Sequence, residues 1–165
     1  KFFSNNYYGL LTGTYYQSKY TGSDNIERNT GFNGRYVVNF LVGKEFKLDA
    51  NKRNYFTTDI KVTSAGGRYY TPIDLAASQL INDYVVKGDA FAFTSRIPDF
   101  FRMDFKIGFV HNSKKSKIAQ SVYFDVQNIT NHKNVFVEGY NTISKEIRTA
   151  YQIGIFPNFV YKIQF

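Results

Sequence analysis

A two-residue alternation of apolar and polar side chains is the strongest constraint in this sequence, and it is clearest from residue 101 to residue 109. One set of alternate positions is apolar: Phe101, Met103, Phe105, Ile107 and Phe109. The intervening positions are charged or glycine: Arg102, Asp104, Lys106 and Gly108. A helix would scatter these side chains around its circumference, whereas a strand separates them onto two faces. The segment is therefore predicted to be a β-strand.

Five further segments show the same alternation: residues 6–20, 31–47, 53–63, 119–129 and 149–165. In residues 119–129, Val122, Phe124 and Val126 alternate with Tyr123, Asp125 and Gln127. The pattern predicts an all-β fold of about six antiparallel strands in one domain, residues 1–165.

The predicted connections are sorted by length. Residues 48–52 and 111–118 are short turns, residues 21–30 are intermediate, and residues 64–99 and 130–148 are long. Long loops at one end and short turns at the other are typical of outer-membrane barrels. Within the longest loop, Thr71 as N-cap and Pro72 at the first helical position predict a short helix over residues 72–81, with an ordered turn as the alternative.

Composition excludes several classes of protein. The chain has no cysteine, which removes disulfide frameworks and thiolate chemistry. It has no run of 18 apolar residues, so it contains no transmembrane helix, although a transmembrane β-barrel remains compatible. The net charge is +8, but the basic residues are dispersed, and the densest group (Lys114, Lys115, Lys117) falls in a predicted turn. We therefore expect no nucleic-acid partner.

Alternation alone does not decide which solvent meets the apolar face. We predict that the polar face lines the lumen of a barrel, although the outer face of a soluble β-sandwich would carry similar residues. The residues assigned to the lumen are Arg102, Asp104, Lys106, Tyr123, Asp125, Gln127, Lys162 and Gln164.

Residues 159–165 (FVYKIQF) place apolar or aromatic side chains at every second position up to a terminal phenylalanine. This pattern is similar to the signature that the barrel assembly machinery recognises in outer-membrane proteins. The positions concerned are Phe159, Tyr161, Ile163 and Phe165.

Residues 124–136 (FDVQNITNHKNVF) resemble the penultimate-strand motif of TonB-dependent receptors, in which an alternating strand ends in an Asn-rich corner, here residues 128–131. Residues 65–75 (AGGRYYTPIDL), residues 98–102 (PDFFR), Gly139-Tyr140-Asn141 and Tyr151-Gln152-Ile153-Gly154 followed by Pro157 are similar to versions common in Bacteroidetes.

The resemblance implies the last six strands of a barrel with roughly 22 strands around a plug domain. It implies a receptor in the bacterial cell outer membrane that takes up a nutrient ligand, energised through TonB. Its partners would be the rest of the barrel and the plug, the TonB energy-coupling complex, the barrel assembly machinery and outer-membrane lipid. Six strands cannot close a barrel that needs at least about eight, so we expect a segment of a larger protein. The alternatives are a passive porin, a structural or adhesin barrel, and a soluble β-sandwich binding module.

In the longest loop, Arg68, Tyr69 and Tyr70 are candidates for ligand contact, because tyrosines combine a broad rigid surface with a polar tip. Anchoring at the membrane interface is an equal alternative. No catalytic motif occurs, and His111 and His132 lack metal-ligand spacing. We therefore expect no enzymatic activity, metal or cofactor.

Overall fold

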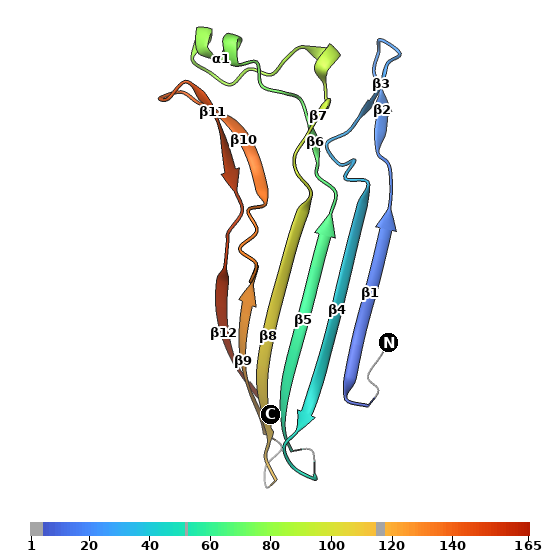
Figure 1. The fold of residues 1–165 in the computed structure, drawn as a ribbon, viewed down its shortest axis with the longest axis vertical. Coiled ribbons are helices and arrows are strands. Elements are labelled where there is room, and N and C mark those ends of the chain that lie inside the picture. The colour runs from blue at the N-terminus through green and yellow to red at the C-terminus, as the bar shows by residue number, and fades with distance from the viewer. Residues whose placement is uncertain (1–4, 52, 115–117) are drawn as a thin grey trace.

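The computed structural model describes residues 5–51, 53–114 and 118–165. Six long strands form one antiparallel sheet in which each strand pairs with the next long strand along the chain (Figure 1). They are β1 (Tyr7–Tyr15), β4 (Tyr36–Lys47), β5 (Asn54–Ala65), β8 (Phe100–Asn112), β9 (Ala119–Gln127) and β12 (Phe156–Gln164). The predicted all-β class and the six alternating strands are confirmed. Lys115 and Lys117 of the predicted basic turn lie outside the described residues.

Shorter elements occupy the three longer connections, all at one end of the sheet (Figure 1). Three two-stranded pairs lie there: β2 (Lys19–Thr21) with β3 (Glu27–Asn29), β6 (Tyr69–Tyr70) with β7 (Ser95–Arg96), and β10 (Val135–Asn141) with β11 (Glu146–Tyr151). Helix α1 (Leu75–Ile81) and the 3-10 turn η1 (Asp89–Phe91) complete this loop end. The connections at the other end, the turn end, are short, as predicted.

Three of the predicted strands are shorter than the alternation indicated: β4 begins at Tyr36 rather than at residue 31, and the two outer segments each divide. Residues 6–20 divide into β1 and β2, and residues 149–165 divide into β11 and β12. The second division has a local cause. The backbone N–H of Gln152 donates to the carbonyl oxygen of Asn134 at 2.8 Å, and β11 pairs with β10, whereas β12 pairs with β9. The prediction of one continuous strand over residues 149–165 is therefore wrong.

The helix in the longest loop begins three residues later than predicted. Its N-cap is Asp74, whose carboxylate accepts the N–H of Ala77 at 3.0 Å. Pro72 lies outside the helix, and its carbonyl oxygen accepts the N–H of Lys87 at 2.9 Å. Thr71 is therefore not the N-cap, because an aspartate three residues further on satisfies the free N–H groups of the first turn.

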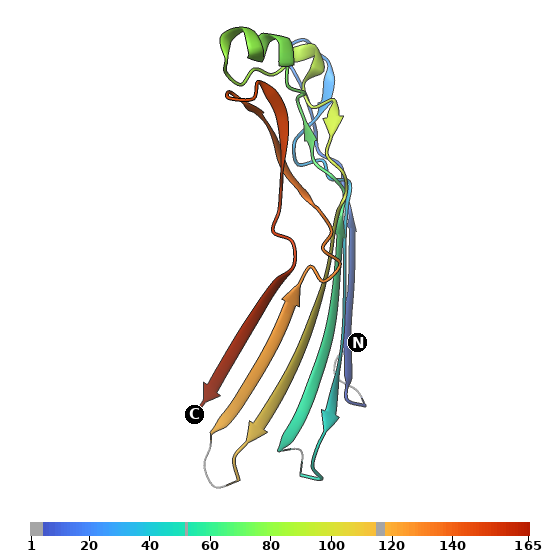
Figure 2. The same cartoon turned by 60° about the vertical axis from the view of Figure 1, so that its left-hand side comes forward.

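The sheet is open and bowed, with β1 and β12 as its edges (Figure 2). Only two apolar side chains among the described residues are buried, Ile73 and Val110. The accessible surface is 11173 Å², whereas a globular protein of 19.1 kDa would expose about 8,400 Å². No second sheet covers the large sheet in the part of the chain described, so the arrangement is not that of a β-sandwich.

Candidate functional site

Strand register sorts the charged side chains of the large sheet onto one face, which we call the polar face. Asp59 pairs with Lys106, and Lys106 in turn pairs with Asp125. All but one of the Asp, Glu, Lys and Arg residues in the six strands share this face: Glu45, Lys47, Asp59, Lys61, Arg102, Asp104, Lys106, Asp125 and Lys162. The exception is Lys44.

The eight residues predicted to line a lumen all lie on this polar face. Arg102, Asp104 and Lys106 alternate along β8, and Tyr123, Asp125 and Gln127 alternate along β9. Lys162 pairs with Ser121 and Gln164 with Ala119, which belong to the same set.

The polar face is the better buried of the two. Its members Thr57, Asp104 and Ser121 are each less than one-tenth exposed. Large side chains on the opposite, apolar face of the inner strands remain open to solvent, with Phe40 42% and both Phe109 and Phe124 43% exposed. This distribution is the reverse of a water-soluble sheet, which buries its apolar face.

Two tyrosines on the polar face lie across glycines of neighbouring strands. The Tyr8 hydroxyl donates to Asp59, and a Cβ added at Gly43 would lie 2.2 Å from the Tyr8 ring. A Cβ at Gly108 would lie 2.4 Å from the ring of Tyr123. Only glycine leaves room for a ring in either place.

Lys106 Nζ lies 4.3 Å from the centre of the Tyr123 ring, so the ring makes a cation–π contact with the Lys106 ammonium. The alternation along β8 could not reveal that contact, because it depends on the register of β9.

Arg102 and Asp104 form the one ion pair on the polar face among the described residues, at 3.0 Å. The other oxygen of Asp104 accepts the backbone N–H of Asn128, also at 3.0 Å. Arg102 Nε is buried without a hydrogen-bond partner. A shallow hollow of about 360 Å³ lies around Tyr8, Asp59 and this pair, so the polar face has room for a further group.

The Asn-rich corner at residues 128–131 ends β9 with a compact turn. Asn128 is 2% exposed and adopts a positive φ of 52°, which asparagine tolerates. Its side-chain oxygen accepts the N–H of His132 at 3.1 Å, and its amide donates to the His132 carbonyl at 3.0 Å. Asn134 bonds both backbone groups of Phe101, at 2.9 and 2.8 Å. The motif residues therefore fix where β9 stops and the outer hairpin begins.

Arg68, Tyr69 and Tyr70 lie at the loop end, beside the β10–β11 hairpin. Arg68 donates to the carbonyl oxygen of Phe136 at 2.8 Å, and the Tyr70 hydroxyl donates to Glu138 at 2.8 Å. Burial, followed by this bond to Glu138, raises the pKa of Tyr70. The three residues line a hollow of about 310 Å³, shared with Phe32, Tyr84 and Phe136. This volume and mixed lining suit a small molecule.

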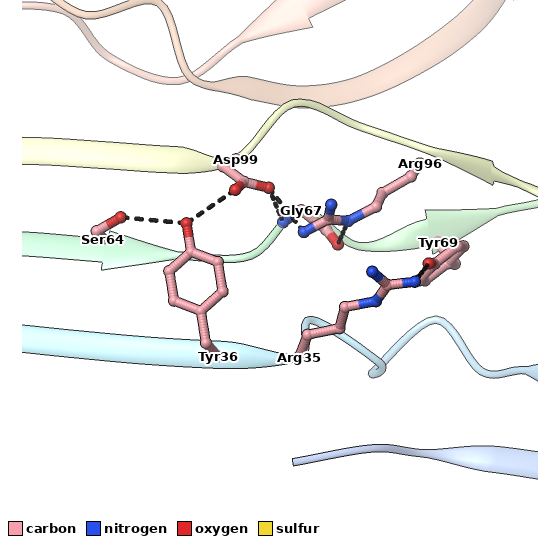
Figure 3. A network of polar contacts seen from close by, with 7 residues as sticks. All are labelled: Arg35, Tyr36, Ser64, Gly67, Tyr69, Arg96 and Asp99. Carbon is pink, nitrogen blue, oxygen red and sulfur yellow. Dashed lines mark hydrogen bonds and ion pairs between the residues drawn. The ribbon is translucent and has the colours of Figure 1, made fainter. Parts of the chain in front are cut away.

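Asp99 anchors the longest loop to the sheet, a role that the sequence did not reveal (Figure 3). Its carboxylate accepts the N–H of Gly67 at 3.0 Å and the hydroxyl of Tyr36 at 2.8 Å, and it pairs with Arg96 at 2.7 Å. The bonds from Gly67 and Tyr36 lower the pKa of Asp99. The Gly66–Gly67 pair is needed here, because a Cβ at Gly66 would lie 1.6 Å from the Gly34 carbonyl oxygen.

Tyr69 is held separately, by Arg35. A guanidinium nitrogen of Arg35 donates to the Tyr69 hydroxyl at 2.6 Å, and the guanidinium lies 5.7 Å from the centre of the Tyr69 ring. These contacts therefore hold in place the part of the loop that carries the residues predicted for ligand contact.

Metal and catalytic groupings are not evident in the described residues. They contain no group of three or more His, Cys, Asp or Glu side chains placed to hold a metal ion. His111 lies within β8 rather than in a turn, and its Nδ1 is 2.6 Å from the side-chain oxygen of Asn54. His132 directly follows the corner and lies edge-on to Phe101. No helix in the described part of the chain is both long and apolar enough to span a bilayer.

Comparisons with protein-family models, curated proteins and solved structures find no significant match to this chain.

Proposed function

We propose that this chain is the C-terminal part of an outer-membrane β-barrel receptor of the TonB-dependent type, which takes up a nutrient ligand actively. The observation that carries the proposal is the segregation of charge on the sheet. The polar face holds every charged side chain of the six strands except Lys44, while the apolar face stays uncovered. A barrel wall between lipid and a polar lumen has this composition.

The height of the apolar face supports a membrane location. Near the turn end, Phe46 of β4 pairs with Phe56 of β5 on this face. Near the loop end, Tyr15 pairs with Tyr36. Tyr36 and Phe46 lie ten residues apart on β4. That is about 34 Å along the strand, or about 24 Å along the bilayer normal at a tilt of about 45°. Barrel proteins have an apolar band about 25 Å tall between aromatic girdles.

The open edges of the sheet agree with a segment of a larger barrel. A strand edge exposes unpaired N–H and C=O groups, which cannot be left unsatisfied in lipid. The remaining strands of the barrel would pair with β1 and β12, and a plug would occupy the polar side. Phe159, Tyr161 and Ile163 lie on the apolar face, and Phe165 follows β12 and is 93% exposed. In this proposal they form the signal for the barrel assembly machinery.

Ligand capture is assigned to the loop end. Arg68, Tyr69 and Tyr70 line the hollow between the longest loop and the β10–β11 hairpin, and Asp99 and Arg35 hold its base. Uptake would then proceed through the lumen, driven by the TonB energy-coupling complex through the plug.

Single-cysteine labelling tests the barrel, because this segment contains no cysteine of its own. In the full-length protein in cells, any other cysteine would first be replaced by serine. Val62→Cys lies on the apolar face and Lys61→Cys on the polar face of the same strand. We expect a membrane-impermeant maleimide to label Lys61→Cys in permeabilised outer membranes, and Val62→Cys only after detergent is added. Equal labelling at both positions before detergent would contradict the proposal.

Two further experiments separate the receptor from the alternative barrels. Deleting Phe165 from the full-length protein should lower its level in the outer membrane, and an unchanged level would contradict the assembly signal. Ligand accumulation that persists without TonB would favour a passive porin over an active receptor.

A further inference from the structure

Lys44 is the only Asp, Glu, Lys or Arg on the apolar face of the six described strands. Its neighbours along β4 on that face are Val42 and Phe46. Across the sheet it pairs with Tyr7 of β1 and Thr58 of β5. A charge on a surface that otherwise excludes charge needs a specific partner, because an isolated ammonium is costly in an apolar environment.

The partners that the chain supplies are two aromatic rings. Lys44 Nζ lies 4.5 Å from the centre of the Tyr7 ring and 4.7 Å from the centre of the Phe46 ring. No carboxylate of the described residues lies within 4 Å of Nζ. The rings hold the ammonium through their π-faces and leave its charge uncompensated. The site is therefore shaped for an anion that arrives from outside the chain.

The position of Lys44 indicates where that anion comes from. Lys44 lies two residues from Phe46, the aromatic residue of β4 near the turn end. That separation is about 7 Å along the strand, or about 5 Å along the bilayer normal at a tilt of about 45°. A lysine stem can extend over that distance and bring its head to the interface. Above it on the same face, Val42, Phe40 and Leu11 offer an apolar surface to acyl chains.

We propose that Lys44, held by the rings of Tyr7 and Phe46, binds the phosphate of an anionic phospholipid in the membrane leaflet at the turn end. The phosphate accepts hydrogen bonds from the ammonium, and the acyl chains lie along the apolar face towards the loop end. This inference rests on the proposed membrane location. The ligand is a lipid rather than free phosphate, because the site continues into the apolar face.

Lipid retention by the purified full-length protein tests the site. The protein is exchanged into detergent, incubated with phosphatidylglycerol, and analysed by native mass spectrometry for bound lipid. Lys44→Met should lower the retained phosphatidylglycerol about fivefold, the effect of one basic residue beside anionic lipid. Lys44→Arg should retain it. Lys61→Met removes a lysine from the polar face of the adjacent strand and is the matched control, with no expected change.

Three results would overturn the inference. One is equal lipid retention by the Lys44→Met and wild-type proteins, and another is equal loss in Lys44→Met and Lys61→Met. The third is complete displacement of the lipid by inorganic phosphate at the same concentration, which would mark a free-anion site. Absence of the wild-type protein from the outer membrane would overturn both this inference and the proposed function, whereas equal retention by a membrane-inserted protein would overturn this inference alone.

Discussion

Substitution of Phe40 by lysine places a charge near the middle of the apolar face. Phe40 is four residues from Tyr36 and six from Phe46, so it lies close to the centre of the proposed apolar band. It is 42% exposed, and no polar side chain opposes it, because its partners are Leu11 and Val62. A lysine there has no route to a counter-ion within the sheet.

The expected cost depends on depth and on face. A lysine at the bilayer midplane of a barrel destabilises it by about 2–4 kcal/mol, which is roughly a 30- to 900-fold change in the folding equilibrium. At Phe46, at the turn end of the proposed apolar band, the same charge should cost at most about 1 kcal/mol. Leu41→Lys is the matched control, because Leu41 is the next residue along β4 and lies on the polar face. It gains Asp59 as a neighbour and meets Lys61, so its cost should stay within about 1 kcal/mol.

Reversible unfolding of the full-length protein in lipid vesicles, followed in guanidinium chloride, measures all three variants. The predicted order of destabilisation is Phe40→Lys, well above Phe46→Lys and Leu41→Lys. Equal costs at Phe40 and Leu41 would refute the assignment of faces. A larger cost at Phe46 than at Phe40 would refute the position of Phe46 at the membrane boundary.

The remaining predictions concern the polar face, the corner and the loop anchor. Gly108→Val should lower the free energy of unfolding by about 1–3 kcal/mol, because the new side chain displaces Tyr123, whereas Gly13→Val, whose Cβ meets nothing within 4 Å, should be nearly neutral in the same denaturant titration. Asn128→Ala should cost about 2–3 kcal/mol, because it leaves buried backbone groups unpaired; thermal unfolding compares it with the wild-type protein. The lowered pKa of Asp99 means that its ionised form stabilises the loop above the ordinary carboxyl pKa of 3.8, and this contribution is lost as pH falls through the lower folded pKa. Protease protection of residues 64–99 should therefore fall below pH 4 in the wild-type protein, and Asp99→Asn should weaken it at pH 7 and reduce its dependence on acid.

The alternation in the sequence was sufficient to predict the strands of the large sheet, but not the residues at which each strand begins and ends. Each strand of the large sheet carries a period-two pattern, because one face is apolar and the other polar. The strand register keeps the polar positions of neighbouring strands on the same face. Residues 149–165 keep the same parity through the break at residues 152–155, so the pattern could not reveal it. The break depends on the bond between Gln152 and Asn134, which only the folded corner brings together.

Those parts of the polar face that lie along a single strand could be predicted from the sequence. The polar positions of β8 and β9 follow from their own alternation. The contacts of Tyr8 with Asp59 and of Tyr36 with Asp99 join residues 51 and 63 positions apart, and no local signal links them. Gly43 was the available hint for the first contact, because a glycine at a polar-face position leaves room for a neighbouring ring.

The separation of β12 from β11 has a consequence for how such a protein can evolve. The β10–β11 hairpin pairs only with itself, so no strand ladder carries its register into the large sheet. Insertions or substitutions in the hairpin can accumulate without shifting the register of any strand pair in the large sheet. Changes in the outer hairpin can therefore alter the loop end while the large sheet keeps the same sequence pattern.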